Sequence, residues 1–136
     1  MNKRIIALIL AVIFIAGCSM APARGKKPFW ARDYIEEKDT FVHLDSGLEG
    51  SLRLVEEATD KTEDLRLIVK AKLMNRYTQT LRVQIQTVFK DEDGFATGDE
   101  TNWELILIPA KAYYYYEAKA MNAQAEKYVI RCRYAK

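Results

Sequence analysis

Two stretches in the middle of the chain alternate between apolar and polar side chains. In residues 65–74 nearly every second side chain is apolar, and in residues 81–90 the alternation is cleaner, with Val83, Ile85 and Phe89 on one side and Arg82 and Gln84 on the other. Successive side chains of a strand point to opposite faces, so a period of two predicts a strand with one buried face. Both stretches are predicted to be strands of a half-buried sheet.

Shorter runs of the same kind predict further strands at 50–56, 103–108, 113–121 and 127–134, and a short one at 41–44. No segment has a convincing helical period. Turn residues separate the runs: Asn75 follows the first long strand, Asp93-Gly94 and Gly98 follow the second, and Pro109 ends the next. Asn75 can close an Asx-turn or adopt the left-handed conformation. Six or seven strands spaced in this way predict an all-β fold, an antiparallel β-sandwich.

The N-terminus has the order of a bacterial export signal. Lys3 and Arg4 precede an apolar run over residues 5–15, and the run ends in Ala16, Gly17 and Cys18. A helix needs roughly 20 apolar residues to cross a bilayer, so this run is too short and fits a signal peptide. The stretch resembles the lipobox of lipoproteins, in which the cysteine thiol receives a diacylglyceryl group.

This similarity predicts three parts of the chain: a signal peptide over 1–17, a lipidated Cys18 with a tether over 18–40, and a sandwich domain over 41–136. Two or more acyl chains hold a protein firmly on a membrane. Ser19 stands where the sorting pattern places aspartate in lipoproteins of the inner membrane. We therefore expect the mature protein to be anchored at the periplasmic face of the outer membrane.

Charge and the tether narrow the choice of partner. Without Lys3 and Arg4 the chain has 19 basic and 19 acidic residues, so the mature chain is formally neutral. A general attraction to nucleic acid is therefore not expected. Residues 19–27 are small, polar and basic, as in a flexible linker. The aromatic cluster at 29–35 that follows is predicted either to pack on the domain as a short helix or to dock elsewhere.

The second half of the chain resembles the YcfL-like family of small envelope lipoproteins. The similarity covers 65–133 together with the lipobox, and it consists of short motifs in order. These motifs are Leu-Met-Asn75, Val83-Gln-Ile-Gln86, Phe89-Lys-Asp-Glu-Asp-Gly94, Trp103, Pro109 and Tyr128-Val-Ile-Arg131. The resemblance implies an immunoglobulin-like sandwich in the periplasm, no known catalytic activity and a loose association with cell-wall synthesis.

A catalytic centre is not predicted. His43 and Cys132 are the only residues that could form a thiol–imidazole pair, with Asp45 as a third member, and nothing in the sequence brings them together. Cys132 alternates with Ile130, which predicts a core thiol, and with Cys18 lipidated it has no disulfide partner. We expect a protein that is not an enzyme.

No metal and no cofactor are expected. Five acidic residues surround the glycine loop after the second long strand, but their spacing does not fit the twelve-residue calcium loop. They are Asp91, Glu92, Asp93, Asp99 and Glu100. The simpler interpretation is a solvated loop that discourages aggregation.

Two features are candidates for binding. Arg82, Lys90, Arg131 and Arg133 share one face if their two strands are neighbours, and such a face could meet an anionic partner or could simply be solvated. The run Tyr113, Tyr114, Tyr115 and Tyr116 must place two rings on each side of a strand, so one pair could form an interface. The alternative is that these tyrosines serve only strand stability, through β-propensity and cross-strand pairing. Trp103 is predicted to lie in the core.

Two functions follow from these features. The first is a non-catalytic, lipid-anchored module that recognises an envelope protein through a sheet face or edge. The alternative is a module that binds peptidoglycan or another glycan through exposed tyrosines and arginines. Tyrosines and Arg131 converging on a groove would favour a small ligand or glycan, whereas a flat face would favour a protein.

Overall fold

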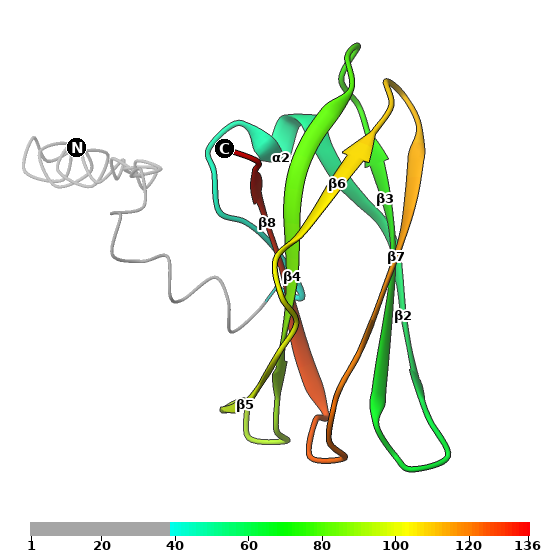
Figure 1. Ribbon diagram of the computed structural model, residues 1–136, viewed down its shortest axis with the longest axis vertical. Helices are drawn as coiled ribbons and strands as arrows, with labels where there is room; N and C mark the ends of the chain where they lie inside the picture. The colour runs from blue at the N-terminus through cyan, green and yellow to red at the C-terminus, as the bar shows by residue number, and fades with distance from the viewer. Residues whose placement is uncertain (1–38) are drawn as a thin grey trace, which may run out of the picture.

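The computed structural model describes residues 39–136, which form eight strands and one helical turn (Figure 1). The predicted signal peptide over 1–17, Cys18, Ser19 and the aromatic cluster at 29–35 lie outside the described residues. The elements are β1 (Phe41–His43), α2 (Leu48–Ser51), β2 (Leu52–Lys61), β3 (Leu67–Asn75), β4 (Leu81–Lys90), β5 (Ala96–Glu100), β6 (Glu104–Ile108), β7 (Tyr113–Lys119) and β8 (Lys127–Tyr134).

The strands form two sheets that pack as a sandwich. In the first sheet β8 lies between β1 and β4, and β5 and β6 pair with different parts of the far side of β4. The second sheet has the order β2-β3-β7. All pairs are antiparallel except β1 with β8, which run parallel. Figure 1 shows these two layers. The prediction of an all-β sandwich is confirmed.

All seven predicted strands are present, but several ends differ: β2 begins at Leu52 after the unpredicted turn α2, β3 begins at Leu67, and β7 ends at Lys119. Two differences are larger. β5 was not predicted because Ala96–Glu100 carries polar residues and a glycine where a strand would show apolar alternation. β2 continues to Lys61, five residues beyond the predicted end, because its second half is polar and exposed. Pairing with β3 holds this half in the sheet despite its lack of an apolar pattern.

The core lies between the two sheets and is built from alternate residues of the strands. Leu73, Ile85, Phe89, Ile108 and Ile130 are completely buried there. Burying one such side chain contributes roughly 1.5–3 kcal/mol relative to leaving it in water. Leu73, Ile85, Phe89 and Ile130 belong to the apolar sets that the period of two identified, whereas the apolar run 105–108 did not show that Ile108 points inward.

Trp103 does not lie in the core, and its prediction as the central aromatic residue was wrong. Its side chain is half-buried, and the Arg133 guanidinium lies 4.0 Å from its ring centroid. Trp103 has the same parity as Leu105, which points outward, whereas Ile106 points inward. Phe89 is instead the largest fully buried side chain.

Asn75 links the two sheets at one end of the sandwich. Its Oδ1 accepts a hydrogen bond from the Tyr77 backbone N–H at 2.8 Å, which closes the predicted Asx-turn. Its Nδ2 donates to the carbonyls of Gln79, Ile108 and Pro109 at 2.8, 2.9 and 3.0 Å. The buried amide therefore joins the β3–β4 turn to the end of β6.

Replacing Asn75 should destabilise the sandwich strongly. In Asn75→Ala the carbonyls of Ile108 and Pro109 lose a buried donor, so we expect the free energy of unfolding to fall by about 3 kcal/mol. Urea denaturation of the variant, followed by tryptophan fluorescence, measures the loss. Asn102→Ala, at an exposed position between strands, is the matched control and should change stability by less than about 0.5 kcal/mol. Equal effects would contradict the role of the amide.

Candidate functional site

The tyrosine run occupies the start of β7 and alternates between the two sides of the second sheet. Tyr113 and Tyr115 point outward, with 49% and 73% of their surface exposed, whereas Tyr116 is 5% exposed and Tyr114 is half-buried. The prediction of two rings on each side is confirmed. The inner pair makes polar contacts with the first sheet: Tyr116 Oη lies 2.9 Å from Thr87 Oγ1, and Tyr114 Oη donates to Glu104 at 3.5 Å.

The outer pair is joined by a lysine from the neighbouring strand. Lys72 Nζ lies 4.8 Å from the ring centroid of Tyr113 and 5.6 Å from that of Tyr115. The register explains this position, because Lys72 of β3 is opposite Tyr115 of β7 and Glu56 of β2. A cation over aromatic rings contributes about 0.5–1 kcal/mol at an exposed site, so the lysine restricts both rings.

We call this surface the tyrosine face; it comprises Tyr113, Tyr115, Lys72, Glu56 and Glu117. Beside Tyr115 it contains a shallow hollow of about 350 Å³, bordered by the two glutamates, Lys72 and Ala58. The charges around the hollow are mixed, and its aromatic lining comes from Tyr115 and the inward-pointing Tyr116. The arrangement offers an aromatic surface with both signs of charge.

The four predicted basic residues lie on the outer face of the first sheet. β4 and β8 are neighbours, with Gln84 opposite Arg133 and Gln86 opposite Arg131, so the shared face is confirmed. Arg133 also donates from Nε to Gln84 Oε1 at 2.9 Å. Beside exposed Arg82 are the exposed side chains of Leu105 and Leu107, which the sequence did not single out.

The tyrosines and the arginines do not converge. Tyr113 and Tyr115 belong to the outer face of one sheet, and Arg82, Arg131 and Arg133 to the outer face of the other. The core of the sandwich separates the two surfaces. The groove that would combine them is therefore not formed, and Tyr114 and Tyr116, which point inward, do not belong to either outer surface.

His43 and Cys132 lie opposite each other in the β1–β8 register, which the sequence could not predict. His43 Nε2 is 2.8 Å from the Leu52 carbonyl, which requires a proton on that nitrogen. The thiol of Cys132 is fully buried, and burial raises its pKa to about 12. The Asp45 carboxylate accepts a hydrogen bond from the Tyr134 backbone N–H at 2.7 Å. The thiol is thus a protonated core group, as predicted.

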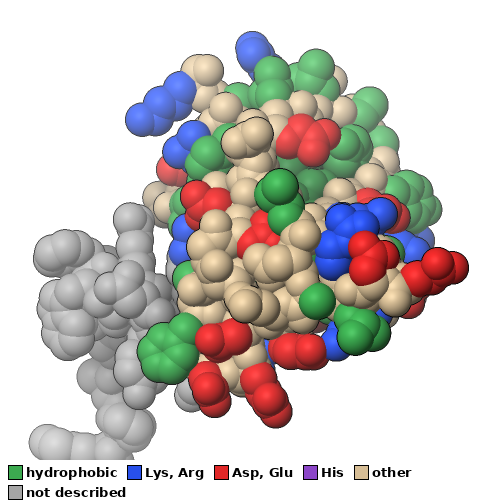
Figure 2. All heavy atoms as spheres, turned by 60° about the horizontal axis from the view of Figure 1, so that its bottom comes forward, with side chains coloured by type: hydrophobic (Ala, Val, Ile, Leu, Met, Phe, Trp, Pro, Cys, Tyr) green, Lys and Arg blue, Asp and Glu red, His purple; other side chains and the backbone are tan. Residues whose placement is uncertain are grey.

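The acidic loop uses its carboxylates in backbone hydrogen bonds. Asp91 Oδ1 accepts from the Phe95 N–H at 2.8 Å, and Asp99 Oδ2 accepts from the Met121 N–H at 2.6 Å. Figure 2 brings this end of the sandwich forward and shows acidic side chains at several separate places. Within residues 39–136 no three histidine, cysteine or acidic side chains are grouped as metal ligands would be.

Comparison with solved structures supports the fold. The crystal structure of Campylobacter jejuni cj0090 is similar to this chain with a TM-score of 0.61 and 19% identity, over 72% of this chain and 100% of that one. A DUF1425 family member from Shewanella sp. pv-4 is similar with a TM-score of 0.54 and 17% identity, over 62% and 79%. Both neighbours share the sandwich fold of this chain. At these identities the similarity concerns the fold alone.

No family model matches the sequence, and no curated protein matches it either. In the part of the chain that the structure covers, none of the helical residues forms a segment long and apolar enough to cross a bilayer.

The raised pKa of Cys132 predicts how stability and thiol reactivity depend on pH. The unfolded thiol ionises near pH 9 and the folded one near 12, so the unfolded state loses protons first. The thiol's contribution to stability should therefore be complete below pH 9 and decrease between pH 9 and 12. Urea denaturation of wild type and Cys132→Ala across this pH range gives two free energies of unfolding at each pH. The change of their difference with pH is the contribution of the thiol. Rapid alkylation of Cys132 in the folded protein at pH 8 would contradict a buried thiol.

Proposed function

We propose that this chain is a non-catalytic, lipid-anchored envelope protein that binds a partner protein through the tyrosine face. The observation that carries the proposal is the exposure of Tyr113 and Tyr115, held on one face by Lys72 between them. Partly restricted tyrosines lose little conformational entropy on binding, and their rings contribute both apolar area and a hydroxyl. These properties suit a protein interface.

The shape of the surface supports a protein partner over a small ligand. A small-molecule site usually encloses most of its ligand with a few convergent polar groups. The hollow beside Tyr115 is shallow, and the arginines that would complete a larger site lie on the other sheet. The non-catalytic part of the proposal is supported by the burial of Cys132 and by the separate hydrogen bonds of His43 and Asp45.

The anchor and the location are supported by sequence alone. The order of basic residues, apolar run and lipobox favours acylation of Cys18. Ser19 after the cysteine favours anchoring of the protein at the periplasmic face of the outer membrane. From the resemblance to the YcfL-like family we also propose that the protein is linked to the machinery of cell-wall synthesis. The mixed charge of the tyrosine face suits a protein partner, because a complementary pattern of charges on the partner would fix the orientation in which the two proteins bind.

Glycan binding remains the second candidate, because aromatic rings can stack on sugars and Tyr115 borders the hollow. It would have to use the tyrosine face without the arginines. Binding of the full chain to purified sacculi, lost in Tyr115→Ala and retained in Arg82→Ala, would favour the glycan over the protein partner.

Crosslinking in cells tests the protein partner. A photoreactive amino acid at Glu56, inside the tyrosine face, should capture one envelope protein, whereas the same group at Arg82 on the opposite sheet should not. Tyr115→Ala should reduce the captured amount about tenfold, as expected for an interface residue worth more than 1 kcal/mol. Equal capture from both positions would contradict the proposed face.

Fractionation tests the anchor. Wild type should remain with the outer membrane, and mass spectrometry should find acyl chains on Cys18. Cys18→Ser should keep its signal peptide and leave that membrane fraction, because the thiol is the acceptor of the lipid. Cys132→Ser, which removes the other thiol, is the control and should remain in place. An unchanged distribution of Cys18→Ser would refute the anchor.

A further inference from the structure

The open edges of the two sheets differ in how well they are protected against pairing with another strand. In the first sheet β1 has only three residues, and the other edge is divided between two five-residue strands, β5 and β6. Short edge strands of this kind resist pairing. They give another strand little continuous backbone to bind.

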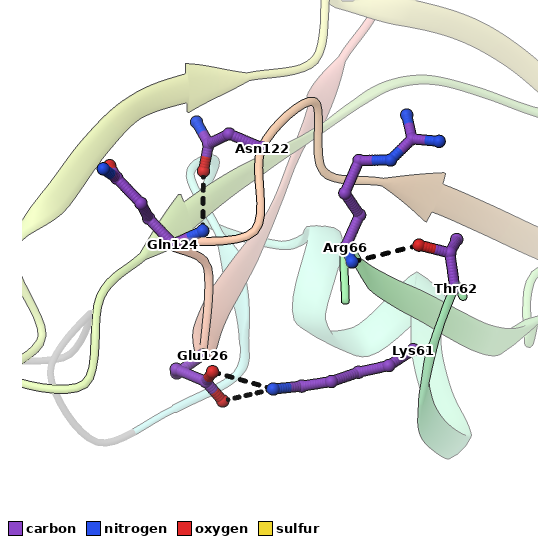
Figure 3. Close-up of polar contacts among 6 residues, drawn as sticks. All are labelled: Lys61, Thr62, Arg66, Asn122, Gln124 and Glu126. Atoms are coloured by element: carbon purple, nitrogen blue, oxygen red, sulfur yellow. Dashed lines mark hydrogen bonds and ion pairs between the residues drawn. The ribbon is translucent and has the colours of Figure 1, made fainter. Parts of the chain in front are cut away.

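In the second sheet the β2 edge is protected as well. Its ladder shifts register between Leu54 and Glu56, which marks a bulge. Near its end Lys61 points across the sandwich to Glu126, with Nζ–Oε distances of 2.7 and 2.9 Å (Figure 3). Bulges and inward-pointing charges are established ways of blocking edge pairing.

β7 forms the remaining edge and lacks these protections. It has seven residues, no proline and a regular register with β3 throughout. Within residues 39–136 it pairs with β3 alone. A regular exposed edge with aromatic side chains is the type of strand that pairs with another chain.

The ladder with β3 shows which backbone groups of β7 are available. The Ala120 N–H donates to the Leu67 carbonyl at 2.9 Å, and the Asn75 N–H donates to the Ala112 carbonyl at 3.0 Å. Antiparallel bonding alternates along a strand, so between these points the even-numbered residues of β7 bond to β3. The N–H and C=O groups facing away from β3 belong to Tyr113, Tyr115, Glu117 and Lys119.

Two copies of β7 can pair only in certain registers. In a two-fold antiparallel pair, outward side chains must be opposite outward side chains, so the axis passes through a residue and not between two. An axis at Glu117 would place two glutamates opposite each other, and an axis at Tyr115 would place Lys119 opposite Lys111. Like charges directly opposite each other destabilise a strand pair.

An axis at Tyr116 avoids both conflicts. It places Tyr113 opposite Lys119 and Tyr115 opposite Glu117 on the outer face. On the inner face it places Tyr114 opposite Ala118, a large side chain opposite a small one. All seven residues of β7 then take part, and each charge meets a tyrosine of the other copy.

We infer that a second copy of this chain is the partner of the β7 edge, paired antiparallel about Tyr116 to give a continuous six-stranded sheet. The two tyrosine faces then lie side by side on one surface. The inference rests on the edge and its register, and does not require the lipid anchor or the protein partner proposed above. Crosslinks from Glu56, two strands away from this edge, test that partner separately.

Cysteine pairs test the edge and its register together. Full-length Tyr115→Cys and Glu117→Cys chains are produced in the same cells and treated briefly with a mild thiol oxidant. The expected result is a disulfide-linked dimer when both variants are present, at least about tenfold above the level from either variant alone. Hydrogen-bonded neighbours in such a pair have Cα atoms about 5.5 Å apart, which suits a disulfide.

Proline variants identify the edge. Lys119→Pro, introduced into both cysteine chains, removes an N–H that faces the second copy but leaves the ladder with β3 intact. It should reduce the linked dimer about tenfold. Thr59→Pro, on the β2 edge of the same sheet, is the matched control. Thr59 is opposite Val69, whose backbone groups bond to β7, so the N–H of Thr59 also points away from the sheet. It should leave the yield unchanged.

Other outcomes overturn the inference. A dimer formed by Tyr115→Cys alone or by Glu117→Cys alone would show a different register. Equal loss with Thr59→Pro would show that the effect is not specific to β7. No linked dimer in the mixed cells would show that a second copy does not occupy this edge.

Discussion

The structure depends on the burial of alternate side chains of two sheets against each other. This packing fixes the direction of every residue in the paired strands, because a shift of one position would turn the apolar set to solvent. Tyr116 illustrates the result: its ring is held inward beside Thr87, so Tyr115 must point outward. The tyrosine face is therefore a consequence of the core, and its geometry is as fixed as the core itself.

Much of the fold could be predicted from sequence because the inner faces are nearly continuous. The alternation at 81–90 gave the bounds of β4, and the inward position of Cys132 followed from its spacing to Ile130. Prediction failed where the pattern was weak. β5 and the end of β2 are polar and belong to the sheets through backbone pairing, which leaves no apolar signal. Trp103 was misplaced because residues 105–108 are all apolar and do not show which face is buried.

The candidate site was less predictable, since it depends on which strands are neighbours. The sequence correctly divided the tyrosines between two faces, but the position of Lys72 over their rings requires the β3–β7 register. The separation of the tyrosines from Arg131 and Arg133 likewise follows from strand order. The β7–β8 connection crosses from one sheet to the other, so these tyrosines and arginines end on opposite outer surfaces although consecutive strands carry them.

The parallel pairing of β1 with β8 has a mechanical consequence. The chain enters the sandwich through β1, whose three residues pair with Ile130, Arg131 and Cys132 of the last strand. A pull on the N-terminal segment along the strand direction loads these hydrogen bonds in shear, so that they must break together and not one after another. The His43 contact with the Leu52 carbonyl adds a connection from β1 to the other sheet. Tension applied at this end is thus shared between both layers.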